Sequence, residues 1–405
     1  MSVKPGNGSS RAAGSSGSAG SSETAGSSGS AGSSGPPPPH RFGESDPFTV
    51  GLEEELLVVD AETLQLAHVA DQILAGTTLP RNRIDHEAFL AEVEVRSEPA
   101  GSVAEAIEQL KEGRREAMRA GAELAGAEGR GSRAGKSAGA TIMAVGLHPD
   151  ARLFDVELVQ SERYERVERQ MQGLIKRTPE CALHVHVGVP DPEAAVAAMN
   201  AIRERLPLLH GLGAGSPFWF GRDSGMASSR AAVIRAYPGR GIPPVLRSWD
   251  QYLACLDAVR AGGGPTDHTM VWWDARPQPR LGTVELREVD VQTDLESAGA
   301  IAALARAIAM RAVEEPLAKP ASEQALHWSS FRAAQDGLDA EIYYEGSPRP
   351  LREVAEAVLG HLGTADPEID GIRRIVREGN GADRQRAAYD NGGMPALLRH
   401  LADET

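Results

Sequence analysis

The sequence is poor in cysteine, in aromatic residues and in positive charge. Its 405 residues include 2 cysteines and 4% aromatic residues, and the formal net charge is −15. The two cysteines, Cys181 and Cys255, lie far apart and do not form the framework of a disulfide-rich secreted protein. The acidic balance argues against a nucleic-acid backbone or an anionic membrane as the main partner.

Long apolar runs are also missing. No stretch approaches the roughly 18 uninterrupted apolar residues of a membrane span. The first residues lack the apolar run of a signal peptide. We therefore expect no membrane partner and a location in the reducing cytoplasm.

Residues 1–46 differ in composition from the rest. The segment contains "SSGSAGSSETAGSSGSAGSSGPPPP", which has too few apolar residues to offset the entropy lost on ordering. We expect a disordered Gly/Ser/Pro-rich tail over 1–46 and a single catalytic domain over 47–405. Within that domain, "GRGSRAGKSAGA" at 129–140 lacks the spacing of a phosphate-binding loop and is interpreted as a solvated basic loop.

Hydrophobic periodicity places strands and helices of unequal length along the domain. Strands are expected at 48–59, 90–97, 140–146, 182–189, 268–275 and 281–291. Helices are expected at 102–127, 155–176, 191–211, 247–260, 294–318, 350–362, 368–378 and 384–402. Asp191 followed by Pro192 is a helix-start signal. The pattern predicts an α+β fold with a large, mostly antiparallel sheet and helices packed on one face.

The first strand, "FTVGLEEELLVVD" at 48–60, carries three consecutive glutamates among apolar residues. Because side chains alternate along a strand, Glu53 and Glu55 share one face and Glu54 takes the other. Two carboxylates on one face are suited to holding Mg²⁺, which prefers oxygen ligands. An exposed acidic edge strand is the alternative, but the flanking residues are too apolar for full exposure.

Three other strands repeat this arrangement of one apolar and one polar face. The polar faces carry Glu92, Glu94 and Arg96 in "AEVEVRSEP", His184 and His186 in "CALHVHVGV", and Thr283, Glu285 and Arg287 in "GTVELREVD". Four such faces favour a lined cavity over a solvated sheet surface. A zinc site at the histidines lacks a recognisable third and fourth ligand, and Cys181 lies by alternation on the strand face opposite His184.

Two loops add basic residues. The segment 216–230, "SPFWFGRDSGMASSR", contains Arg222 and Arg230, and guanidinium groups bind carboxylates or phosphates with two parallel hydrogen bonds. An ordinary turn with surface arginines is the alternative for this segment. The segment 269–282 contains Arg276, together with Trp272 and Trp273, which we assign to the core.

These segments, with "HWSSFRAAQDGL" further on, resemble in order the carboxylate–amine ligase family. This family is the bacterial branch of glutamate–cysteine ligase type 2, within the glutamine-synthetase-like ligases. The resemblance runs from about Phe48 to beyond Leu338. It implies a funnel-like active site on an antiparallel sheet and a reaction that uses ATP and two or three Mg²⁺ ions.

The resemblance also implies residue roles. The metal-binding carboxylates would be Glu53, Glu55, Glu94 and Glu285. Arg287 and Arg276 would stabilise anions, and Arg230 would belong to the substrate loop. His186, His184, Arg222 and Arg332 would contact the nucleotide or its metal. The sequence departs from the family pattern around Arg332 and at Glu98, which follows Ser97.

The leading hypothesis is an ATP-dependent ligase that joins a carboxylate, with glutamate expected, to cysteine or another amine through an acyl phosphate. Its partners would be small molecules, and the chain would form a homodimer. One alternative is a zinc-dependent amidase or hydrolase built on His184, His186 and the carboxylates. Another is a ligase fold that has lost catalysis and binds a nucleotide or an amino acid.

Overall fold

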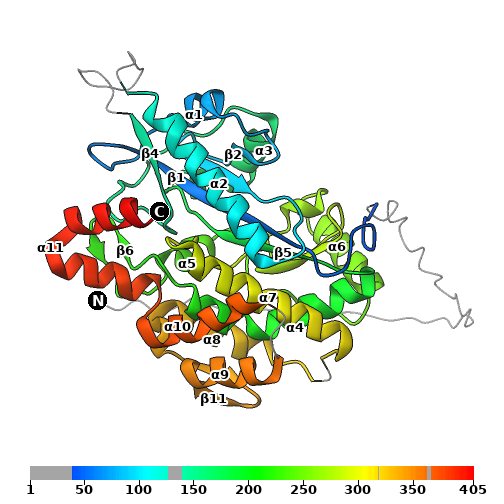
Figure 1. Ribbon diagram of the computed structural model, residues 1–405. Coiled ribbons are helices and arrows are strands. Elements are labelled where there is room, and N and C mark those ends of the chain that lie inside the picture. The colour runs from blue at the N-terminus through cyan, green and yellow to red at the C-terminus, as the bar shows by residue number, and fades with distance from the viewer. Residues whose placement is uncertain (1–38, 126–138, 318, 363–365) are drawn as a thin grey trace, which may run out of the picture. The chain divides into compact units, whose positions relative to one another are not determined.

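The computed structural model describes residues 39–125, 139–317, 319–362 and 366–405 (Figure 1). Its strands are β1 (Val50–Asp60), β2 (Ile84–His86), β3 (Glu92–Arg96), β4 (Ala140–Met143), β5 (Leu183–Gly188), β6 (Phe218–Trp219), β7 (Arg222–Asp223), β8 (Ala275–Gln278), β9 (Thr283–Leu286), β10 (Glu341–Tyr344) and β11 (Ser347–Pro350). Its α-helices are α1 (Ala70–Gly76), α2 (Val103–Ala122), α3 (Glu162–Met171), α4 (Pro192–Leu212), α5 (Ser229–Ile234), α6 (Trp249–Ala261), α7 (Leu295–Glu314), α8 (Glu323–Asp336), α9 (Leu351–Leu362), α10 (Gly371–Glu378) and α11 (Gly381–Glu404).

The largest sheet of the described chain has seven strands. Its strand order is β2–β3–β1–β5–β9–β8, and β4 pairs with β1 from Leu57 to Asp60, on the side of β1 away from β3. The strand pairs of this sheet in the described chain are antiparallel. The expected fold class is confirmed: α+β, with a large antiparallel sheet and helices packed against it.

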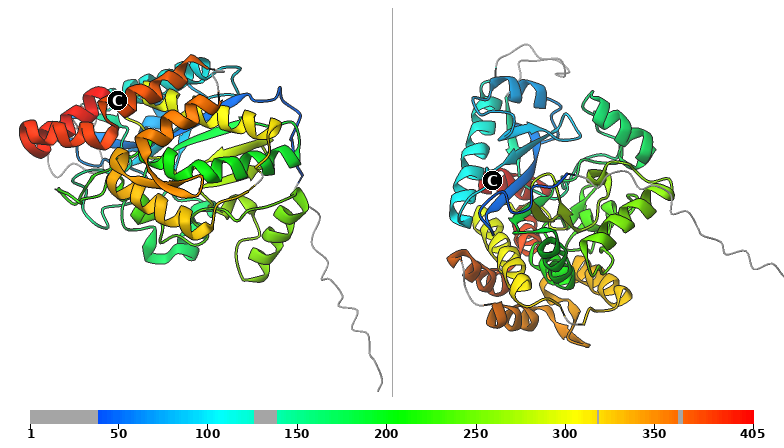
Figure 2. Two further views of the ribbon diagram at one scale, coloured as in Figure 1. Left: turned by 90° about the horizontal axis from the view of Figure 1, so that it is seen from below. Right: turned by 90° about the vertical axis from the view of Figure 1, so that its right-hand side faces the viewer.

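Helices α2, α4 and α7 cover the apolar face of the sheet. The alternating residues Leu52 and Leu56 of β1 are buried on this face. Helix α2 approaches especially closely at Gly113, where a Cβ would overlap the side chain of Val95. Helix α3 lies on the opposite side of the sheet from α2, as the right-hand view of Figure 2 shows.

The middle glutamate of β1 is an exception on this apolar face. Glu54 is fully buried, and its two carboxylate oxygens accept hydrogen bonds of 2.9 and 2.6 Å from Nε and Nη2 of Arg114, on α2. Arg114 also donates to the carbonyl oxygens of Gln292 and Thr293, each at 2.7 Å. Glu54 is therefore a structural residue, and Arg114 of α2 neutralises its charge.

The sequence predictions hold best for the long elements. Asp191 caps α4 as expected, accepting a hydrogen bond of 2.8 Å from Ala194 N–H. The strand predicted at 268–275 is wrong: a turn of 3₁₀ helix spans His268–Met270, and β8 begins at Ala275. Arg276 donates to the carbonyl oxygens of Thr269 and Val271, which holds this segment as a loop. Elements that the sequence did not predict include the short α1 and α5, and α8.

The predicted boundary at residue 46 stays a prediction. Of residues 1–46 the structure describes 39–46, where Phe42 is buried and its ring meets that of Trp249 edge-on, with centroids 5.4 Å apart. The basic loop predicted at 129–140 lies almost wholly outside the described residues.

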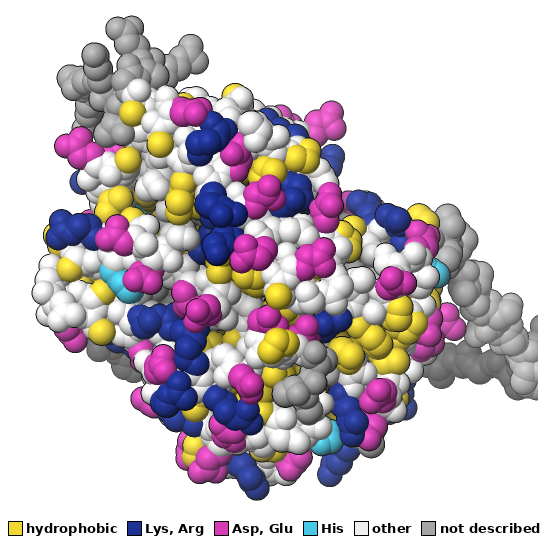
Figure 3. Space-filling view, in the orientation of Figure 1, with side chains coloured by type: hydrophobic (Ala, Val, Ile, Leu, Met, Phe, Trp, Pro, Cys, Tyr) yellow, Lys and Arg dark blue, Asp and Glu magenta, His cyan; other side chains and the backbone are white. Residues whose placement is uncertain are grey.

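The surface over α2 and α7 carries charges of both signs side by side (Figure 3). Several form ion pairs, such as Arg119 of α2 with Glu116 and Glu123. Within the described residues, no helix is long and apolar enough to cross a lipid bilayer.

The pairing of Glu54 with Arg114 can be tested by unfolding. Arg114→Met leaves a charged carboxylate unpaired in the core, and we expect the free energy of unfolding to fall by about 3–5 kcal/mol. The double variant Glu54→Leu/Arg114→Met should recover most of that loss, because an apolar pair needs no compensation. Urea titrations measure both. Arg115→Met, at the exposed neighbouring position, is the control, and equal stability of Arg114→Met and this control would contradict the assignment.

Candidate active site

Antiparallel pairing aligns the charged residues in rows across the sheet. Glu53 of β1 lies opposite His184 of β5, and His186 lies opposite Glu285 of β9. Glu55 of β1 lies opposite Glu94 of β3, and Glu285 of β9 lies opposite Arg276 of β8. Because paired residues project to the same side of a sheet, these side chains form one polar face, as the sequence predicted.

Glu53, Glu94 and His184 form the tightest cluster on this polar face. Each offers a ligand atom, and these atoms lie within 4.8 Å of one another. Glu53 Oε2 is 3.3 Å from His184 Nδ1, and Arg96 forms an ion pair with Glu94. Burial lowers the pKa of His184 to about 3, with Arg287 adding to the effect, so this imidazole is neutral and able to ligate.

His186 extends the cluster towards β9. Its Nδ1 lies 3.0 Å from Thr283 Oγ1, while its Nε2 lies 3.6 Å from Glu53 Oε1 and makes no hydrogen bond. Burial opposes protonation of His186, but Glu53 and Glu285 outweigh it and raise its pKa. Burial likewise acts to raise the pKa of Glu53, and the two histidines reverse this and hold it well below the usual value.

The donor set fits a divalent cation. Two carboxylates and a neutral imidazole converge, and the buried His186 Nε2 beside them has no hydrogen-bond partner. Carboxylate oxygens are the ligands that Mg²⁺ prefers, whereas structural zinc sites are rich in Cys and His. Since oxygen donors dominate, the cluster favours Mg²⁺ or Mn²⁺ over zinc.

Glu285 is held differently from the other predicted metal ligands. Arg276 Nε donates to one of its oxygens at 2.7 Å, and Arg287 pairs with the other. These two arginines overcome burial and keep the pKa of Glu285 well below its usual range. The buried Nε of Arg287 makes no hydrogen bond, so it keeps one donor for an anionic ligand.

Glu55 lies beside the cluster of Glu53, Glu94 and His184 and is not one of its members. Its Oε2 accepts a hydrogen bond of 2.6 Å from Ala182 N–H, and its Oε1 lies 3.7 Å from His184 Nε2. Burial, together with the charges of Glu87 and Glu180, raises its pKa to about 8. Glu55 thus borders the cluster and faces a cavity beside it.

This polar-face cavity has a volume of about 110 Å³. Glu55, His184, Arg287 and Arg230 line it, so it adjoins the cluster directly. Arg230, on α5, is fixed by Glu180 at 2.9 Å and by the carbonyl oxygen of Glu288 at 3.1 Å. The structure therefore brings together nine of the predicted site residues: Glu53, Glu55, Glu94, Glu285, His184, His186, Arg230, Arg276 and Arg287.

Two predicted residues are not brought to this face. Arg222 is exposed on β7, and Arg332 is exposed on α8, where it pairs with Asp336 at 2.8 Å and with Gln335 at 3.0 Å. Within the described residues, neither forms a hydrogen bond or an ion pair with a residue of the polar face.

Sequence reasoning missed several residues that line the cavity. They include Glu87, Glu180, Arg163, Arg240, Tyr164, Tyr237, Met270 and Trp272. Most lie in loops or on α3, where no alternation rule applies. Trp272, assigned to the core from the sequence, is only half-buried and lines the cavity, whereas Trp273 does lie in the core.

The predicted orientation of Cys181 is also wrong. Its Sγ lies 3.5 Å from Glu92 Oε1, and Glu92 lines the same cavity. Alternation failed because β5 begins only at Leu183, so Cys181 precedes the strand.

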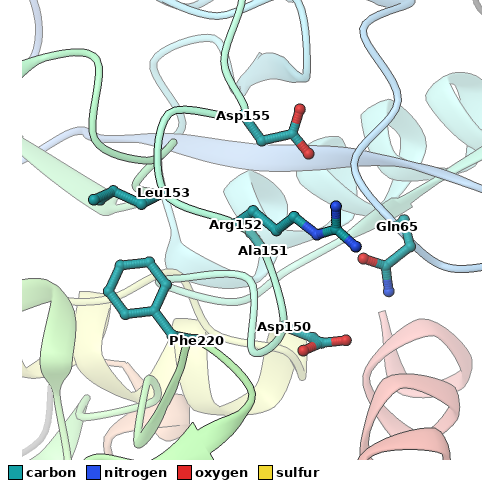
Figure 4. A pocket seen from close by; sticks show the side chains of 7 residues that line it. All are labelled: Gln65, Asp150, Ala151, Arg152, Leu153, Asp155 and Phe220. Carbon is teal, nitrogen blue, oxygen red and sulfur yellow. The ribbon is translucent and has the colours of Figure 1, made fainter.

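A wider cavity of about 630 Å³ lies elsewhere on the molecule. Gln65, Phe220 and residues of the segment 150–155 line it, with Arg152 pointing towards Gln65 (Figure 4). No predicted site residue contributes to its lining, so it is not the candidate active site.

Comparisons with known proteins identify the family of the chain. The model of the family described as glutamate–cysteine ligase family 2 matches residues 49–400. A relative from Rubrobacter xylanophilus, provisionally named glutamate–cysteine ligase 2-3, is 35% identical over 376 residues, which is 90% of this chain and 99% of the relative. A relative from Ruegeria pomeroyi, provisionally named glutamate–cysteine ligase 2, is 31% identical over 88% of this chain and 94% of its own length.

Solved structures share the fold at low sequence identity. The glutamate–cysteine ligase of Francisella tularensis in complex with AMP has a TM-score of 0.65 and 14% identity, over 88% of each chain. The bifunctional glutathione synthetase of Pasteurella multocida has a TM-score of 0.59 and 14% identity, over 88% of this chain and 52% of that one. Both comparisons show that the sheet and its helices have the fold of these two solved enzymes.

Titration with Mn²⁺, a probe for Mg²⁺ sites, tests the cluster. Glu53→Gln removes one charged ligand, and we expect Mn²⁺ affinity to fall at least tenfold, about the loss typical of altering a metal site. Glu62→Gln is the matched control, because Glu62 is exposed just beyond β1. Undiminished Mn²⁺ affinity in Glu53→Gln, by electron paramagnetic resonance, would refute the assignment.

Proposed function

The chain belongs to glutamate–cysteine ligase family 2, whose members are ATP-dependent ligases, and from that premise we propose that it forms an amide from a carboxylate and an amine through an acyl phosphate. Glutamate is the proposed acid, and cysteine or another amino compound is the proposed amine. The names of the relatives support glutamate as the acid and cysteine as one candidate amine, and experiment decides between cysteine and other amines.

One observation carries the proposal. A carboxylate–imidazole cluster lies on the same buried face as two arginines, with His186 and Glu285 opposite each other between them. Phosphoryl transfer depends chiefly on positioning and on neutralising the charge of the phosphate oxygens, and much less on covalent help from the protein. This face combines cation-binding carboxylates with guanidinium groups, as that chemistry requires.

The residues divide into three proposed roles. Glu53 and Glu94, with His184, would hold Mg²⁺, which when bound neutralises phosphate charge. Arg287 keeps a free Nε donor, so it would bind the transferring phosphoryl group, and Arg276 positions Glu285 beside it. Arg230, fixed at the far side of the cavity, would orient the organic substrate.

The reaction would proceed in two steps. An oxygen of the substrate carboxylate attacks the γ-phosphorus of ATP, the bond to the bridging oxygen breaks, and ADP leaves. The amine nitrogen then attacks the acyl carbon, the bond from that carbon to the phosphate oxygen breaks, and inorganic phosphate leaves. The amine loses a proton as the amide forms. Burial of the site protects the acyl phosphate from water.

The predictions about the oligomeric state, the location in the cell and the number of metal ions stay predictions. Small-molecule substrates fit the family, and we propose a cytoplasmic homodimer that uses ATP and two or three Mg²⁺ ions. Analytical ultracentrifugation of the purified chain tests the homodimer.

ADP release tests the proposed function. With ATP, Mg²⁺ and glutamate, we expect ADP release to depend on an added amine, and Arg287→Ala to lower it on the order of a hundredfold, because a donor to the transition state is lost. Arg280→Ala, at an exposed arginine between β8 and β9, should keep wild-type activity.

Other results would point to the alternatives. Stoichiometric zinc with amide hydrolysis in the absence of ATP would establish a hydrolase. ATP binding without turnover, over a panel of acids and amines, would establish a ligase fold without catalysis. Full activity of Arg287→Ala would overturn the role given to this arginine.

A further inference from the structure

The polar-face cavity has two unlike sides. One is the charged sheet surface at Glu55 and Glu92, with Glu87 and Glu180 beside it. The other is an apolar wall, which we define as the lining residues Phe89, Val167, Met171, Ile175, Met270 and Trp272. A ligand that fills this cavity must therefore have a charged end and an apolar body.

The apolar wall belongs to a hydrophobic cluster of its own. Val167 and Met171 of α3 are buried there with Phe89 and Ile175, apart from the main core under the sheet. Met270 and Trp272 pack against the same cluster from the loop before β8. Because these side chains also line the cavity, their apolar surface is available to a ligand.

The charges that line the cavity are not balanced. Three of the lining arginines are already engaged: Arg230 with Glu180 and Asp290, Arg240 with Asp274, and Arg287 with Glu285. Among the described residues, Glu55, Glu87 and Glu92 have no arginine within ion-pair distance. Glu92 is 1% exposed, and its Oε2 makes no hydrogen bond. Carboxylates in a largely buried cavity without a cationic partner favour a cationic ligand.

Resting on the proposed function, we propose that the cavity is the acceptor site, and that the acceptor is a primary amine with an apolar body of several carbons. Its ammonium group lies among Glu55, Glu87 and Glu92, one of which takes a proton from it so that the freed nitrogen lone pair can attack, and its carbon chain or ring lies against the apolar wall. The cavity of about 110 Å³ is several times larger than a single water requires, so a body of several carbons has room. This chemistry differs from that of cysteine, whose side chain is one methylene and a thiol.

Such an amine could be an apolar α-amino acid or a simple alkyl or aralkyl amine, and Arg163 would distinguish these two classes. Arg163 lies over the ring of Tyr164 at 5.5 Å and forms no ion pair among the described residues. An apolar α-amino acid would place its carboxylate at Arg163, whereas a simple alkyl or aralkyl amine would leave it unpaired. The acceptor panel should therefore contain leucine and phenylalanine beside isopentylamine and phenethylamine, with cysteine, ethanolamine and ammonia as references.

The first measurement separates this inference from the proposed function. Hydroxylamine traps acyl phosphates as hydroxamates without needing the apolar wall. Hydroxamate formation from glutamate and ATP would sustain the ligase chemistry whatever the acceptor is. If hydroxamate forms but the apolar amines have kcat/KM values no higher than ethanolamine or cysteine, the acceptor inference is overturned by itself. If neither hydroxamate nor amide forms, the proposed function fails.

Variants of the wall supply the second measurement. In Met171→Gln we expect kcat/KM for the best apolar acceptor to fall about tenfold relative to ammonia, because a polar group replaces apolar contact. Val167→Thr, which barely changes volume, should lower the same ratio by a smaller factor. Leu174→Gln is the matched control, since Leu174 is exposed beyond α3 and does not line the cavity. An equal ratio in Met171→Gln and Leu174→Gln would refute the inference.

Binding gives a readout that does not depend on the acid. In the presence of ADP, phenethylamine should raise the melting temperature of the wild type and of Leu174→Gln more than ethanolamine does, since a ligand that binds only the folded state stabilises it. Met171→Gln should lose this difference. Equal shifts with both amines in the wild type would overturn the proposal.

Discussion

The pairing of Glu54 with Arg114 is the interaction on which the site depends. Strand β1 carries three adjacent carboxylates, and alternation sends two of them to one face and one to the other. The one on the core side would be untenable if charged and alone, and Arg114 neutralises it with two hydrogen bonds. The same arginine binds the carbonyls of Gln292 and Thr293, so it also fixes the chain that follows β9. Glu54 is thus neutralised on the core side, whereas Glu53 and Glu55 project to the polar face, where the proposed reaction takes place.

Charge on the polar face is distributed unevenly. This separates a region suited to binding phosphate from a region suited to binding a cation. Around Glu285 two arginines supply an excess of positive charge suited to phosphate. Around Glu53 and Glu94 the neighbours are a neutral histidine and Arg96, which leaves oxygen donors for a cation. Towards α3, Glu92 and Glu87 keep no cationic partner within the described chain. Regions of positive and negative charge thus alternate across neighbouring strands. The register of the strand pairs determines which charged side chains lie beside one another.

Much of this arrangement could be predicted from the sequence, because strand alternation is a local rule. It placed Glu53, Glu94, His184 and Glu285 on one face without knowledge of which strands are neighbours. It failed at Cys181, where the strand had not yet begun, and at Trp272, which lies in a loop held by Arg276. Glu87, Glu180 and the residues of α3 carry no such signal, since only the tertiary path of their segments brings them to the cavity. Arg222 was chosen from the residue types of its loop and Arg332 from a resemblance of short segments, and the structure leaves both exposed.

The separate hydrophobic cluster behind α3 has a consequence for how such enzymes diverge. Substitutions in the main core disturb many neighbours and are usually destabilising, whereas α3 packs on a small cluster that is separate from the main core. Gene duplicates could therefore exchange Val167 or Met171 for other side chains while β1, β5 and β9 keep their register and charges. A lineage could in this way acquire new amide products by changing one short helix, with the machinery for activating the acid inherited intact.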